Sequence, residues 1–150
     1  MKIIIPYHKQ KRDHYCGPAT LQMAFAFFKY RISQSKLAKQ AKTNLKTGTS
    51  HRGMINAIKI NEFQYQTIKG SDFNKISVFL KKHLPIIVNF IEPSHNEGHY
   101  AIVVGITKTK IILNDPWNGN NFVMSRNIFF KRWHDSKNTA KKWMLILYKE

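Results

Sequence analysis

The chain has 150 residues, of which 43% are hydrophobic, and a formal charge of +17 from 25 Lys and Arg against 8 Asp and Glu. This length and apolar content predict a single folded domain, residues 1–150, and exclude an intrinsically disordered chain. The single cysteine excludes an internal disulfide, and no apolar run approaches the roughly 20 residues needed to span a bilayer.

The first half of the chain predicts four helices. Gly17-Pro18 opens the first, and its apolar stripe ends before Tyr30-Arg31. The other three follow capping residues. Ser33 caps a helix over about 34–42, and Thr49 or Ser50 caps one that carries Met54, Ile55 and Ile58. Ser71 or Asp72 caps the last, which carries Phe73, Ile76, Phe79 and Leu80.

From Pro85 onward the pattern is extended. Short β-branched or aromatic runs are separated by turn residues, in the order PIIVNFIE, HYAIVVGIT, KIILND, NFVMS and KWMLILYK, and one helix over about 125–134 interrupts them. Helices first and strands later predict an α+β fold, in which an N-terminal helical part packs on a C-terminal antiparallel β-sheet.

The only cysteine, Cys16, stands immediately before Gly17-Pro18. At a helix start, unpaired backbone N–H groups and the helix dipole favour a negative charge, which stabilises a thiolate. On its own, the pattern is more typical of a buried packing cysteine. A nucleophilic role would require a base and a group that orients it.

His99 and Asp115 are the candidates for those two roles. His99 begins the run HYAIVVGIT, and Asp115 ends the run KIILND, so a hairpin between the two runs brings them together. If the loop between the two runs has an odd number of residues, or if a bulge has the same effect, both side chains point to the same face of the sheet as near-diagonal neighbours. Taken singly, a strand-start histidine is often a surface residue, and Asn-Asp-Pro is a good turn starter.

Gln10 is the fourth candidate. A neutral amide six residues before the cysteine can donate a hydrogen bond to the oxyanion that forms when a thiolate attacks a carbonyl. In isolation it is a polar loop residue.

Together, the segments PYHKQKRDHYCGPATLQMAF, GHYAIVVGI and ILNDPW resemble the papain-like cysteine peptidases, specifically cysteine peptidase family 39, the bacteriocin-processing or double-glycine leader peptidases. The resemblance spans nearly the whole chain. It implies a papain-like fold, hydrolysis of a peptide bond in a peptide or protein substrate such as a leader peptide, and no metal or cofactor. It further implies that Cys16 is the nucleophile, His99 the general base and acid, Asp115 its orienting partner and Gln10 the oxyanion-hole residue.

Two departures from that family stand out. Many members carry an acidic residue before the cysteine, where this chain has Tyr15, and the transporter-linked members continue into membrane spans and an ATPase. A relative with another peptide substrate, outside an exporter, is therefore an equal expectation. The three isoleucines before Pro6 are too few for a signal-peptide core, so the expected location is the cytoplasm, or the cytoplasmic side of a larger protein. The oligomeric state stays open.

Other functions are also compatible with the sequence. The charge of +17 allows an anionic partner such as nucleic acid, a membrane surface or an acidic peptide, although the lysines are scattered and no nucleic-acid-reading motif is present. An inactive papain-like peptide-binding module, and an amide hydrolase or acyltransferase with the same site, are further alternatives. His95, Glu97 and His99 suggest a metal site only weakly, because the flanking Pro93 and Gly98 favour a loop. Trp117, Trp133 and Trp143 are expected to cover the core, with Trp117 beside Asp115 also able to shield the site from water.

Overall fold

The helices expected from the sequence form, and the second, third and fourth begin at capping residues that the sequence indicates. The computed structural model describes residues 1–149 and contains α1 (Cys16–Phe27), α2 (Gln34–Gln40), α3 (His51–Ile60), α4 (Phe73–Lys81) and α5 (Arg126–Arg132). The side chains of Ser33, Ser50, Asp72 and Ser125 each accept a hydrogen bond from a backbone N–H in the first turn of α2, α3, α4 and α5. The sequence had left two of these caps open, and the structure selects Ser50 and Asp72.

The strands form one antiparallel sheet of six, five of them from the second half of the chain. Its strands are β1 (Gln64–Ile68), β2 (Ile86–Glu92), β3 (Glu97–Ile106), β4 (Lys110–Asp115), β5 (Gly119–Ser125) and β6 (Met144–Tyr148), in the spatial order β1-β6-β2-β3-β4-β5. The expected α+β class is confirmed. The sequence prediction missed β1, an edge strand in which only Tyr65 and Ile68 are half-buried and the other three residues are exposed.

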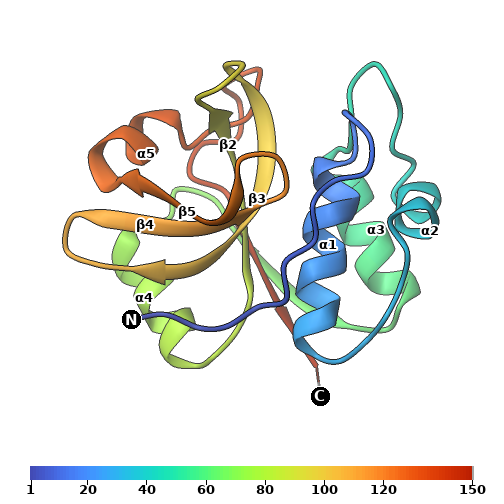
Figure 1. The fold of residues 1–150 in the computed structure, drawn as a ribbon, viewed down its shortest axis with the longest axis horizontal. Helices are drawn as coiled ribbons and strands as arrows, with labels where there is room; N and C mark the ends of the chain where they lie inside the picture. The colour runs from blue at the N-terminus through green and yellow to red at the C-terminus, as the bar shows by residue number, and fades with distance from the viewer. Residues whose placement is uncertain (150) are drawn as a thin grey trace.

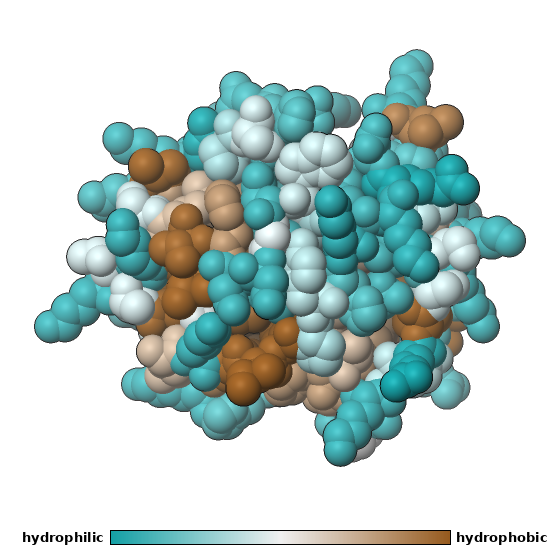
Figure 2. Space-filling view, in the orientation of Figure 1, coloured by the Kyte–Doolittle hydropathy of each residue, from teal (hydrophilic) through white to brown (hydrophobic). Residues whose placement is uncertain are grey.

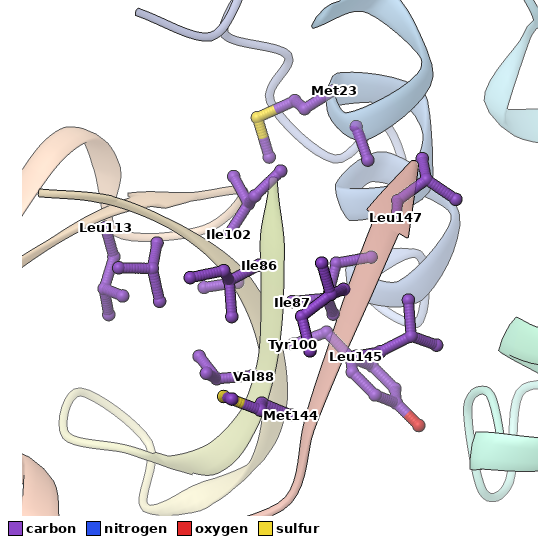
Figure 3. Close-up of a cluster of buried hydrophobic side chains, with 14 of the residues drawn as sticks. Met23, Ile86, Ile87, Val88, Tyr100, Ile102, Leu113, Met144, Leu145 and Leu147 are labelled. Atoms are coloured by element: carbon purple, nitrogen blue, oxygen red, sulfur yellow. The ribbon is translucent and has the colours of Figure 1, made fainter. Parts of the chain in front are cut away.

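The sheet separates two groups of helices. Figure 1 shows α1, α2 and α3 together on one side of the molecule, and α4 and α5 beside the sheet on the other. Buried side chains fill the space between the sheet and the helices on each side, because the side chains of β2 alternate between the two faces of the sheet. In Figure 3, Ile87 and Leu145 lie on the side of β2 that faces α1, whereas Ile86 and Val88 lie on the opposite side.

A β-bulge interrupts the pairing of β3 with β4 between Val103 and Gly105. The N-terminal residues lie against it, since Lys2 forms a bridge with Gly105 and the Ile3 N–H donates to the Val104 carbonyl at 2.7 Å. A Cβ on residue 105 would lie 3.0 Å from the Met1 carbonyl oxygen, so glycine permits this close approach.

The surface reflects the composition. In Figure 2 most of the visible face is hydrophilic, and apolar patches gather over β4, β5 and the N-terminal segment. Among residues 1–149, no helix is both long enough and apolar enough to cross a membrane.

Candidate active site

Cys16 is the first residue of α1, and its side chain is partly exposed. The next residue explains the local sequence, because a Cβ on Gly17 would lie 2.7 Å from Thr49 Oγ1 and 2.8 Å from Thr49 Cβ. Only glycine lets the start of α1 pack this closely against the loop before α3. The helix begins at Cys16 without a side-chain cap, so the backbone N–H groups of its first turn are available to a negative charge near the sulfur.

The bulge in β3 sets the relative positions of His99 and Asp115. Beyond the bulge Ile102 pairs with Asn114, so Asp115 stands opposite Ala101, two residues from His99 and on the same face. Without the bulge Asp115 would stand opposite Ile102 and point to the other face. His99 Nε2 donates to Asp115 Oδ1 at 2.6 Å. The hairpin expected from the sequence therefore forms, and its bulge places His99 and Asp115 on the same face of the sheet.

His99 is held in one orientation from several directions. Its side chain is 7% exposed, and its backbone carbonyl accepts from Asn89 Nδ2 at 3.1 Å. Burial by itself lowers the pKa of His99, but the hydrogen bond to Asp115 and the proximity of Cys16 outweigh it and raise the pKa to about 10. Since Nε2 is engaged with the carboxylate, Nδ1 is the ring nitrogen left for the sulfur.

Asp115 is fully buried and lies in a second set of contacts that the sequence analysis missed. Besides His99, its Oδ1 accepts from the backbone N–H groups of Trp117 and Asn118, each at 2.9 Å. The Asn118 side-chain Nδ2 donates to Asp115 Oδ2 and to Glu92 Oε1, both at 3.2 Å. Asn118 therefore joins two buried carboxylates. No spacing in the sequence indicates this link, because Glu92 and Asn118 belong to different strand ends.

Gln10 lies at the same site, with a side chain that is 8% exposed. Its backbone N–H donates to the Pro116 carbonyl at 3.0 Å, which ties the N-terminal segment to the turn after Asp115. The side-chain Nε2 donates to the carbonyls of Arg12 and Asp13 at 3.0 and 2.9 Å, and Oε1 has no donor within residues 1–149. The amide is thus fixed by its own loop.

A cavity of about 260 Å³ unites these groups. Gln10, Cys16 and His99 line it, and Asp115 lies behind His99. The rest of its wall consists of Asp13, Glu92, His95, Glu97, Gly98 and Trp117. A larger hollow of about 750 Å³ lies at the C-terminal end of α1, between Pro6 and Tyr30, and contains none of the candidate residues.

The remaining sequence expectations have mixed outcomes. Trp133 and Trp143 are buried in the core as expected, but Trp117 is 39% exposed and lines the cavity. His95 and Glu97 are exposed in and after the turn between β2 and β3, and His99 is committed to Asp115. Among residues 1–149, no group of three or more His, Cys, Asp or Glu is arranged to hold a metal ion.

Comparison with known sequences gives two matches that cover most of the chain. The model of the peptidase C39-like family matches residues 2–141. MesD of Leuconostoc mesenteroides, a mesentericin transport/processing ATP-binding protein, is 34% identical over 117 residues. This match covers 76% of the chain but only 15% of MesD.

Solved structures resemble the fold along its whole length. The peptidase domain of Streptococcus ComA, a bifunctional ABC transporter involved in quorum sensing, is 26% identical with a TM-score of 0.76, covering 96% of this chain and 98% of that one. A double-glycine motif protease from an AMS/PCAT transporter, crystallised with a leader peptide, has a TM-score of 0.78 at 17% identity over 99% and 94% of the two chains. A C39-like peptidase from Bacillus anthracis has a TM-score of 0.77 at 14% identity, over 100% and 98%.

Proposed function

The chain belongs to the peptidase C39-like family of cysteine peptidases, and from this premise we propose that it cleaves a peptide bond with Cys16 as nucleophile and His99 as acid and base. The observation that carries the proposal is that Cys16 and His99 line one cavity while Asp115 holds the far side of the imidazole. The double-glycine protease that shares this fold was crystallised with a leader peptide, which makes a leader peptide the first substrate class to test.

In the first half of the proposed reaction, the Cys16 sulfur attacks the carbonyl carbon of the scissile bond. The raised pKa of His99, which the Asp115 hydrogen bond maintains against burial, keeps a proton on the imidazole at neutral pH. His99 Nδ1 gives this proton to the leaving amine as the C–N bond breaks, and a thioester with Cys16 remains. Asp115 fixes the tautomer, because an ionised carboxylate only accepts hydrogen bonds and so keeps the Nε2 proton on its side.

In the second half, the same residues act in reverse. His99 takes a proton from water, the resulting hydroxide attacks the thioester carbonyl, and the C–S bond breaks to release the acid and restore Cys16. The backbone N–H of Cys16 is one proposed donor to the oxyanion, and the Gln10 side chain is the other. Gln10 can serve in this way if the carbonyls of Arg12 and Asp13 share one amide hydrogen, which leaves the second for the cavity.

Alkylation tests the first link directly, because Cys16 is the only cysteine and every label reports on it. At neutral pH we expect iodoacetamide to modify Cys16 much faster than a model thiol, and His99→Ala to slow the reaction. Equal rates for the protein and the model thiol would remove the proposed activation of the sulfur.

Cleavage of a peptide library that includes Gly-Gly sites tests the reaction itself. Cys16→Ala is expected to abolish cleavage with an unchanged circular dichroism spectrum, and Gln10→Ala to lower kcat on the order of 10² to 10³. Cleavage that persists in the Cys16→Ala protein would show that the nucleophile is wrongly assigned.

A further inference from the structure

The cavity that holds Cys16 and His99 carries a charge opposite to that of the molecule. Of the eight acidic residues in the sequence, Asp13, Glu92 and Glu97 line it, whereas none of the 25 Lys and Arg does, although all 25 lie within residues 1–149. A fourth carboxylate, Asp115, lies directly behind His99, but the protonated imidazole offsets its charge, so the negative charge of the wall comes from the other three. The cleft is therefore an acidic opening in a protein with a charge of +17.

No Lys or Arg of residues 1–149 forms an ion pair with these carboxylates, although the Arg132 guanidinium donates to the backbone carbonyls of Ile91 and Glu92. Within residues 1–149, the two ion pairs at 4.0 Å or less are both histidine pairs, His95 with Glu92 and His99 with Asp115. Burial tends to raise the pKa of Glu92, but hydrogen bonds from Ser94, His95 and Asn118 outweigh it and lower the pKa to about 2. Glu92 therefore keeps its negative charge at any pH at which the protein would work.

Two further features of the wall suit a cation or a hydrogen-bond donor. Gln10 lines the cavity as a residue that is 8% exposed, and its Oε1 has no donor within residues 1–149. A buried acceptor without a partner is unfavourable, so a hydrogen-bond donor that reaches it would be stabilised. Trp117 is 39% exposed on the same wall, and an indole face attracts ammonium and guanidinium groups.

We infer that the peptide substrate places a cationic group, the side chain of a Lys or Arg near the scissile bond, in the cleft formed by Asp13, Glu92, Glu97 and Trp117. This inference rests on the proposed function and names the substrate class of that site. The overall charge does not contradict it. Long-range repulsion between a basic protein and a basic peptide is screened beyond about 10 Å at 0.1 M salt, whereas contacts inside a cleft are screened much less.

Matched peptides test the inference. Each peptide of a series would keep the same Gly-Gly cleavage site and carry a single Lys at one of the four positions before or after it. Matched peptides with norleucine or Glu at that position are the neutral and acidic counterparts. At the best position we expect kcat/KM at 0.15 M salt to be about fivefold or more higher for Lys than for norleucine, and lowest for Glu. An N-acetylated copy of each peptide excludes the terminal amine as the recognised group.

Two exposed carboxylates offer variants that should fold normally. Asp13→Asn and Glu97→Gln are each expected to reduce the ratio of kcat/KM for the Lys peptide to that for the norleucine peptide about two- to fivefold, which is the usual contribution of one exposed ion pair. Glu62→Gln removes the same charge from an exposed position outside the cavity and should leave the ratio unchanged. A ratio near one in the unmodified enzyme, or equal losses in all three variants, would overturn the inference.

The inference and the proposed function fail in different ways. Cleavage without charge preference would contradict the inference alone. If no peptide is cleaved, the proposed function fails, and fluorescence polarisation of the same labelled peptides with the Cys16→Ala protein decides the inference. Tighter binding of the Lys peptide than of the norleucine peptide would then support it, and equal binding would refute it.

Discussion

At the residue scale, the hydrogen bond between His99 and Asp115 governs the protonation of the site. Burial alone would lower the pKa of this imidazole from its ordinary value of 6.5, but the hydrogen bond and the nearby Cys16 together raise the pKa to about 10. Because the folded value exceeds the unfolded one, the charged imidazole stabilises the fold. This contribution is complete below about pH 6.5 and disappears as the pH rises through about 10.

Asp115→Asn tests this coupling. The amide cannot supply the negative charge, so burial should dominate and the pKa of His99 should fall steeply, which NMR of ¹³C-labelled histidine measures. The unfolding free energy of the unmodified protein, relative to the variant, should also decrease between pH 6.5 and 10. Cleavage should fall less than with His99→Ala, which loses the acid–base contribution on the order of 10² to 10⁴. An unchanged His99 titration in the variant would contradict this account.

The sequence could identify some residues of the site but not all. Cys16, His99, Asp115 and Gln10 stand in recognisable segments, and the structure brings them together around one cavity. The support around them has no local signature. Asn118, for example, joins two carboxylates that lie 23 positions apart in the chain, Glu92 and Asp115, and only the folded sheet brings their oxygens within reach of one amide.

At the element scale, Thr49 connects the helix of the sulfur with the strand of the imidazole. Gly17, next to Cys16, packs on the Thr49 side chain, and Tyr100, next to His99, donates its hydroxyl to the Thr49 carbonyl at 2.9 Å. The two side chains proposed to react, Cys16 and His99, are therefore positioned relative to the same residue. Together with the direct packing of α1 on β3, this contact helps to set the spacing between the two elements at the site.

Gly17→Ala should disturb that spacing without touching a reacting atom. The added methyl group would lie 2.7 to 2.8 Å from Thr49 Oγ1 and Cβ, so α1 or the loop before α3 must shift. Overpacking of this kind costs about 1 to 3 kcal/mol of stability, which thermal unfolding measures. We also expect slower alkylation of Cys16 at a temperature where the variant is folded. Alkylation at the unmodified rate would show that α1 keeps its position despite the added methyl.

The pattern of elements was predictable where local signals are strong. Capping residues and apolar runs located the helices and five of the strands. β1 escaped because Gln64, Gln66 and Thr67 give it little apolar character, and it becomes a strand by pairing with β6 at the sheet edge. The bulge at Val103–Gly105 was also not predicted, because a loop with an odd number of residues would equally have placed His99 and Asp115 on the same face.

At the scale of the whole molecule, net charge opposes folding. The chain carries 25 basic and 8 acidic residues, and within residues 1–149 no Lys or Arg lies within 4.0 Å of a carboxylate oxygen. Self-repulsion of such a surface destabilises the compact state, and added salt screens it. The sequence gives the size of this charge, but the acidic cleft is formed by residues as distant as Asp13 and Glu97, so its location required the fold.

Salt should therefore stabilise this protein. We expect Tm to rise by several degrees between 0.05 and 0.5 M NaCl, measured by differential scanning calorimetry at pH 7, because repulsion is screened and few attractive pairs are weakened. Sodium sulfate at equal ionic strength separates screening from ion-specific effects. A Tm that falls with NaCl would mean that attractive contacts dominate the surface.

The solitary thiol at the mouth of the cavity has a redox consequence. Cys16 is partly exposed, and the chain holds no second cysteine that could capture it as a disulfide after oxidation to a sulfenic acid. Reduction of the sulfenic acid back to the thiol must then come from an external reductant such as a small cellular thiol. Further oxidation to a sulfinic acid would inactivate the sulfur irreversibly.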